Sequence, residues 1–111
     1  MLDVSGCSKL EILECYDNQL TALDIGDWIN LQRLTCLNDN ITYLDVSKCK
    51  SLRNLECSGN KLTSLDVSEC KELEELNCAG NKIISLNLGE CKLLTKLICH
   101  SDQLKALDIS K

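Results

Sequence analysis

The sequence has no excess of positive charge: its 111 residues include 12 lysines and arginines against 17 aspartates and glutamates, for a net charge of −5. A nucleic-acid interface needs a basic face to meet the phosphates, so this balance disfavours a nucleic-acid partner. The chain also lacks an apolar run long enough to cross a bilayer, and we expect no membrane insertion. No secretory leader pattern opens the sequence, so none is predicted.

Residues that commonly perform catalysis or bind metals are sparse. His100 is the only histidine, and no serine or cysteine nucleophile with an orienting acid can be assigned to it. The nine cysteines include no Cys-x-x-Cys motif and no Cys–His pair at zinc-ligand spacing. We therefore expect a non-enzymatic protein with no catalytic residues, no metal site and no cofactor.

The chain does contain a unit of 21 residues that reads approximately LxxLxCxxNxLxxLDVSxCxx. Its copies begin at Leu10, Leu31, Leu52, Leu73 and Leu94, with no insertion or deletion between them. A strict period of this length indicates a solenoid, since no single unit can bury its own apolar face. We expect residues 1–111 to form one solenoid with a half unit at 2–9, full units at 10–30, 31–51, 52–72 and 73–93, and a partial unit at 94–111.

Four positions of the unit hold only leucine or isoleucine, in lanes that begin at Leu10, Leu13, Leu20 and Leu23. A fifth aliphatic lane includes Ile25. Such regularity predicts an interior stack, in which each buried side chain contributes ~1.5–3 kcal/mol. Alternation around 13–15 and 23–25 predicts two short strands per unit, and no segment keeps a helical period.

A polar position follows the first predicted strand and holds Asn18, Asp39, Asn60, Asn81 and Asp102. An inward amide at a tight turn can bond the backbone of its own and of neighbouring coils. The string LxxLxCxxNxL resembles the leucine-rich-repeat consensus LxxLxLxxN/CxL, and the LDVSxC that follows resembles a second, nested copy. Over residues 2–110 the chain is similar to the 21-residue leucine-rich repeats of bacterial proteins.

This resemblance implies a right-handed solenoid with a parallel β-sheet on its concave side, and we expect a second short strand in each coil and little or no helix. It also implies protein binding, in bacteria often at a cell surface. The departures are Asp39 and Asp102 at the asparagine position and Trp28 at a cysteine position, and they put the continuity of those lanes in doubt. Trp28 fits either local packing or a binding contact.

The cysteines fall on two lanes. One holds Cys15, Cys36, Cys57, Cys78 and Cys99, and the other holds Cys7, Cys49, Cys70 and Cys91. We favour reduced thiols that fill the interior, because the side chains of a stacked lane run parallel, whereas a disulfide or a tetrahedral metal site needs convergent ones. Reduced cysteines favour a cytoplasmic location, whereas the family resemblance allows secretion or a cell surface, so the location stays open.

Outward positions vary between units, as they do on a solvated surface and also on one that fits a partner. The candidate binding residues on the first strands are Ile12, Tyr16, Arg33, Leu37 and Ile98. Tyrosine and arginine are frequent interface anchors. A second outward lane is acidic, with Asp3, Asp24, Asp45, Asp66 and Asp108, and we expect local hydrogen bonds to offset its repulsion, with an ordered cation as the alternative.

These features predict a non-catalytic module that presents a repeat-built surface to a protein partner. The alternative is a structural spacer, or a fragment of a longer repeat protein that associates end to end with its own copies, because open solenoid ends expose apolar lanes and strand edges. The first reading places function on outward-facing lanes rather than in one deep pocket, and the alternative places it at the open ends of the solenoid.

Overall fold

The structure is a computed structural model, and it describes residues 2–3, 9–16, 19–24, 29–89, 91–100 and 106–108. Its elements are all strands: β1 (Leu2–Asp3), β2 (Ile12–Tyr16), β3 (Leu23–Asp24), β4 (Arg33–Leu37), β5 (Asn54–Glu56), β6 (Ser64–Asp66), β7 (Glu75–Asn77), β8 (Ser85–Asn87), β9 (Lys96–Ile98) and β10 (Ala106–Asp108). Within these ranges the chain forms no helix, and so none that could cross a membrane.

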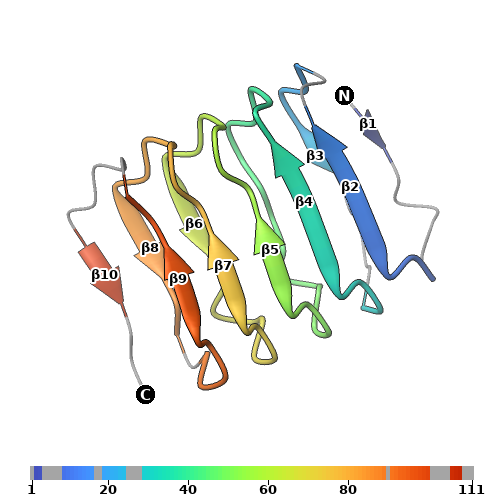
Figure 1. The fold of residues 1–111 in the computed structure, drawn as a ribbon, viewed down its shortest axis with the longest axis vertical. Coiled ribbons are helices and arrows are strands. Elements are labelled where there is room, and N and C mark those ends of the chain that lie inside the picture. Colours follow the sequence, from blue (N-terminus) through green and yellow to red (C-terminus); the bar gives the residue numbers. More distant parts are fainter. Residues whose placement is uncertain are drawn as a thin grey trace.

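The first strands of the coils form one five-stranded parallel sheet in the order β2-β4-β5-β7-β9, and the second strands lie behind it (Figure 1). The second strands pair in parallel as β1-β3 and as β6-β8-β10. Each residue pairs with the same position of the next unit, so Leu34 lies between Leu13 and Leu55. The predicted solenoid of stacked leucine-rich repeats with little or no helix is therefore confirmed.

The unit at 31–51 departs from the prediction of a second strand in each coil, because residues 41–46 form no strand. Contact between coils is looser at this point. The Thr42 N–H lies 3.4 Å from the Thr21 carbonyl oxygen, whereas the Ile84 N–H lies 2.9 Å from that of Thr63. A hollow of about 310 Å³ lies beside this stretch, lined by Tyr43, Leu44, Asp45, Ser47, Ser64, Asp66 and Glu69. The second strands accordingly form two separate sheets, one on each side of this stretch.

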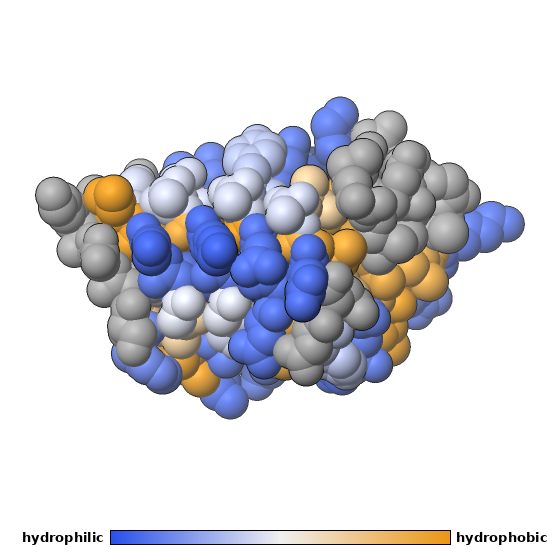
Figure 2. All heavy atoms as spheres, turned by 90° about the horizontal axis from the view of Figure 1, so that it is seen from above, coloured by the Kyte–Doolittle hydropathy of each residue, from blue (hydrophilic) through white to orange (hydrophobic). Residues whose placement is uncertain are grey.

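The aliphatic lanes form the core between the two layers of strands. In the central coils these side chains are fully enclosed: Leu31, Leu34, Leu52, Leu55, Leu62, Leu73 and Ile83 have no exposed surface. At the outer strands the same positions are only partly buried, as Leu13 and Leu97 show. Burial therefore depends on having a coil on each side, as expected for a solenoid. On the surface, hydrophilic and near-neutral residues form rows that cross the coils (Figure 2).

The asparagine lane connects neighbouring coils through buried amides. Asn60 Nδ2 donates to the carbonyl oxygens of Cys36 (2.6 Å) and Cys57 (3.1 Å), and its Oδ1 accepts from the Ile41 N–H at 3.2 Å. Asn81 repeats this pattern one coil further along. Asp39 occupies the same position one coil earlier than Asn60, and its Oδ1 likewise accepts a hydrogen bond from the Leu20 N–H at 3.3 Å. Unlike the asparagines, its carboxylate has no N–H to donate.

The predicted role of the amides is thus confirmed at Asn60 and Asn81. At Asp39 the accepted hydrogen bond is present, and only the bonds that an asparagine N–H would donate are lost. Asn18 and Asp102 lie outside the described residues. The chain turns just before this lane, where Asn38, Gly59 and Gly80 have positive φ angles of 54°, 74° and 69°. Glycine is needed at position 59 for its backbone angle, and a Cβ there would also displace the Asn38 side chain.

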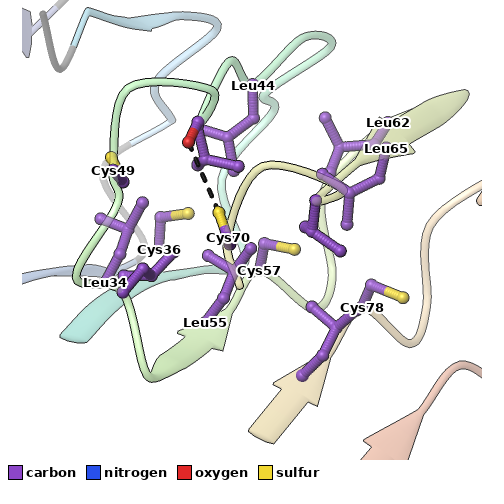
Figure 3. Packing of buried hydrophobic residues seen from close by; sticks show 14 of the residues in the cluster. Leu34, Cys36, Leu44, Cys49, Leu55, Cys57, Leu62, Leu65, Cys70 and Cys78 are labelled. Carbon is purple, nitrogen blue, oxygen red and sulfur yellow. Dashed lines mark hydrogen bonds between the residues drawn. The ribbon is translucent and has the colours of Figure 1, made fainter. Parts of the chain in front are cut away.

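The cysteines follow the predicted lanes, and all eight described ones are free thiols. Cys36, Cys57 and Cys78 have no exposed surface and pack against the leucines of the first strands (Figure 3). On the second lane, Cys70 Sγ donates to the Val46 carbonyl oxygen at 3.5 Å, and Cys91 Sγ makes the equivalent contact one coil later. These thiols thus donate to the preceding coil, as the asparagines do. Cys7 lies outside the described residues.

Burial makes most of these thiols poor nucleophiles. Desolvation raises the pKa of Cys36 and of Cys70 to about 12 and that of Cys49 to about 11, so these groups are protonated at pH 8. Because the thiolate is the reactive form, we expect iodoacetamide to modify the partly exposed Cys91 and Cys99 well before the central cysteines. Peptide mass mapping over time checks this order, with urea-unfolded protein as the control. Modification of Cys36 as fast as Cys99 would contradict it.

Candidate interaction surface

The face of the five-stranded sheet that points away from the core carries the predicted binding residues. On β2 and β4 every second side chain lies on this face because strand side chains alternate. Ile12 and Tyr16, at the two ends of β2, are 54% and 46% exposed. On β4, Arg33 is exposed and Leu37 is partly buried, and Ile98, at the end of β9, is also partly buried.

A hollow of about 340 Å³ lies on this face over β2, β4 and β5. Its lining residues are Glu14, Tyr16, Arg33, Thr35, Leu37, Asn54 and Glu56. The structure thus places Tyr16, Arg33 and Leu37 around one concavity. It does not place Ile12 there, and Ile98 lines a separate hollow of about 50 Å³ on β5, β7 and β9.

Sequence reasoning did not select Glu14, Thr35, Asn54 and Glu56, which also line the larger hollow. The available signal was their position. Glu14, Thr35 and Glu56 occupy the same position in three successive units, and the register pairs Thr35 with both glutamates. A short residue between two long ones on adjacent strands leaves a depression, so this triplet could have been recognised from the repeat alignment.

Few partners within the protein satisfy the polar groups of the larger hollow. The Tyr16 hydroxyl donates to Glu14 Oε2 at 3.1 Å, and this bond to a carboxylate raises the pKa of Tyr16. Asn54 Nδ2 donates to Glu75 Oε2 at 2.8 Å. Among the described residues, no ion pair joins Arg33 to either Glu14 or Glu56. The face therefore offers exposed charges of both signs beside an aromatic ring.

The second layer of strands carries the acidic lane, and its carboxylates take part in local turns. Asp45 Oδ1 accepts from the Ser47 N–H at 2.9 Å, and Asp66 Oδ1 accepts from both the N–H and the hydroxyl of Ser68. The bond from the Ser47 backbone is the main cause that lowers the pKa of Asp45. Local hydrogen bonding at this lane, the expected arrangement, is therefore confirmed at Asp45 and Asp66. The side chains of Asp3, Asp24 and Asp108, like Trp28, lie outside the described part.

No site for catalysis emerges from the described residues. His100 is exposed after β9, and no group of three His, Cys, Asp or Glu side chains in the described ranges could hold a metal ion. The carboxylates of Asp45 and Asp66 bond to their own turns, and the described cysteines are buried or partly buried. What this part of the chain does offer is a rigid sheet face with an irregular, partly apolar surface.

Comparison with known proteins agrees with this architecture. A family model described as leucine-rich repeats in two copies matches residues 50–96. Residues 50–96 are therefore similar to leucine-rich repeats, and the repeat unit has the 21-residue spacing seen in the sequence. Leucine-rich repeats of this kind generally serve as protein-interaction modules and are typically not enzymes.

One similar solved structure is the functional domain of InlJ from Listeria monocytogenes, which includes a cysteine ladder. The two share 28% sequence identity with a TM-score of 0.62, and the match covers 98% of this chain and 32% of that one. The chain thus spans about a third of the length of the protein chain it matches. A search of curated proteins found no match. The stacked thiols described above form a cysteine ladder in this chain as well.

Proposed function

We propose that the protein is a non-catalytic interaction module that binds a protein partner through the outward face of its five-stranded sheet, at the end that carries β2 and β4. The observation that carries this proposal is the grouping of Tyr16, Arg33 and Leu37 around one hollow. Exposed Ile12 lies on the same face of β2. Tyrosine and arginine beside a concavity are the residue types that most often dominate binding energy at interfaces.

Rigidity supports the same proposal. The backbone under this face is fixed by the parallel pairing of β2, β4 and β5 and by the buried leucines below it. A surface already held in its binding conformation loses little conformational entropy on association. Ile98, at the other edge of the sheet, would extend the contact toward the later coils.

The proposal predicts that contact with a partner depends on Tyr16 and does not depend on Tyr43. Tyr43 is a matched control, because it is also an exposed tyrosine (68%) but lies in the second half of a coil. We expect a photo-reactive benzoylphenylalanine at position 16 to cross-link a specific protein from the source organism or its host. The purified partner should then bind Tyr16→Ala at least tenfold more weakly, by calorimetry, and Tyr43→Ala with unchanged affinity.

Since Tyr16 packs into no core, Tyr16→Ala should keep the wild-type unfolding midpoint. Cross-linking from position 43 but not from position 16 would move the interface to the opposite side of the molecule. An affinity unaffected by Tyr16→Ala would likewise overturn the assignment of this face.

A further inference from the structure

The hollow over β2, β4 and β5 is lined at its centre by hydrogen-bond acceptors. Glu14, Thr35 and Glu56 lie directly across from one another on three adjacent strands. Neighbouring strands are about 4.8 Å apart, so the two carboxylates flank the threonine on either side. The two negative charges lie two strands apart and together favour a positive group placed between them.

Thr35 is the second and independent observation. It points to the outward face, yet its side chain is only 7% exposed, because the longer glutamates stand on both sides of it. Its hydroxyl makes no hydrogen bond to any described residue, although it lines the hollow. The Thr35 oxygen is not sealed from water, so a ligand that enters the hollow can donate to it in place of water.

The remaining walls define the shape of that ligand. Tyr16 and Leu37, at the ends of β2 and β4, line one side of the acceptor row with apolar surface. Arg33 lies on the other side of the row, at the start of β4, and would repel a second positive group there. The hollow thus suits a positively charged head with several N–H donors, carried on a hydrocarbon stem that lies against Tyr16 and Leu37.

We infer that this hollow receives a basic side chain, an arginine or a lysine, of the protein partner. This inference rests on the proposed function, and it names the chemistry that the partner must present there. The positive head lies between Glu14 and Glu56 and donates to both carboxylates and to the Thr35 hydroxyl. The Tyr16 ring adds a cation–π contact, and its hydroxyl holds the Glu14 carboxylate in place at 3.1 Å.

Nuclear magnetic resonance on the isotope-labelled protein tests the inference without a known partner. The probes are N-acetyl-arginine amide and its uncharged analogue N-acetyl-citrulline amide, each added up to tens of millimolar. We expect saturable shifts of the Glu14, Thr35 and Glu56 amide signals with arginine, and at least tenfold weaker binding of citrulline. The double variant E14Q/E56Q should bind arginine at least tenfold more weakly than the wild type.

Glu72→Gln is the matched control, because it removes one exposed carboxylate outside the hollow and should leave binding unchanged. Equal responses to arginine and citrulline would overturn the inference, as would arginine binding that survives E14Q/E56Q. Calcium chloride serves as a third probe. Calcium shifts of the same three signals at a tenth of the arginine concentration would make this a metal site and overturn the inference too.

The outcome is separable from that of the proposed function. If arginine fails to bind while position 16 still cross-links a partner, the interface stands and its chemistry is different. If arginine binds but position 16 cross-links nothing, the hollow is real and the proposed protein-binding face is wrong.

Discussion

Replacing Asn60 with alanine should destabilise the protein by roughly 3–5 kcal/mol, because the loss leaves several buried backbone groups without hydrogen bonds at about 1–3 kcal/mol each. The groups are the carbonyl oxygens of Cys36 and Cys57 and the N–H of Ile41, and Asn60 itself is only 5% exposed. An effect of this size is a large part of the stability of a small domain. Urea unfolding followed by circular dichroism measures it.

The asparagine lane also offers a control substitution that should raise stability rather than lower it. Asp39 occupies the asparagine position one coil earlier and is 3% exposed, and it can accept but not donate. Asp39→Asn supplies the missing N–H donors in a geometry that Asn60 and Asn81 already show, and should stabilise the protein by about 1–2 kcal/mol. Loss of stability in this variant, or an Asn60→Ala protein as stable as the wild type, would show that the amides do not connect the coils.

Replacing Leu55 with alanine should cost about 3–5 kcal/mol, the range expected when a fully buried leucine leaves a cavity. Leu55 has no exposed surface and lies between Leu34 and Leu76 in the middle of the aliphatic lane. Rigid coils on both sides prevent the neighbouring side chains from closing the gap. The same urea titration measures the loss, and an unchanged slope of the transition would show that the unfolded state is unaffected.

Leu93→Ala is the matched control, since it makes the same chemical change at a side chain that is 52% exposed. Its cost should stay within about 0.5 kcal/mol. If the two substitutions had similar effects, the leucines of the lane that begins at Leu13 would not be packed between coils as the structure shows them.

The inner half of the molecule could be predicted from the sequence because every coil solves the same packing problem. Leu34, Leu55 and Leu76 are aliphatic in successive units for one reason, and their stacking and burial follow from that repetition. The bonds of Asn60 and Asn81 followed in the same way, from one amide at a turn in each unit. Reduced, inward cysteines were likewise predicted from the parallel side chains of a stacked lane.

The surface could not be predicted to the same degree, because it depends on how unlike residues meet across coils. Thr35 was placed on an outward lane, but its burial requires long side chains at Glu14 and Glu56 on both adjacent strands. The interruption of the second strands at 41–46 was also missed, since that stretch reads as a normal repeat. Choosing residues one at a time by their type identified Tyr16, Arg33 and Leu37. It did not identify Glu14, Thr35 and Glu56, which lie between them and form a group.

The constant register of the first sheet has a consequence for how such a protein can change. Every strand pair in this sheet joins equivalent positions, as Leu13, Leu34 and Leu55 do, so each strand pairing repeats the one before it. A whole unit could therefore be duplicated or removed by recombination within the gene without altering the interior. Such an event would bring side chains such as Glu14 and Glu56 beside new neighbours. The surface could diversify by shuffling units while the interior stayed the same.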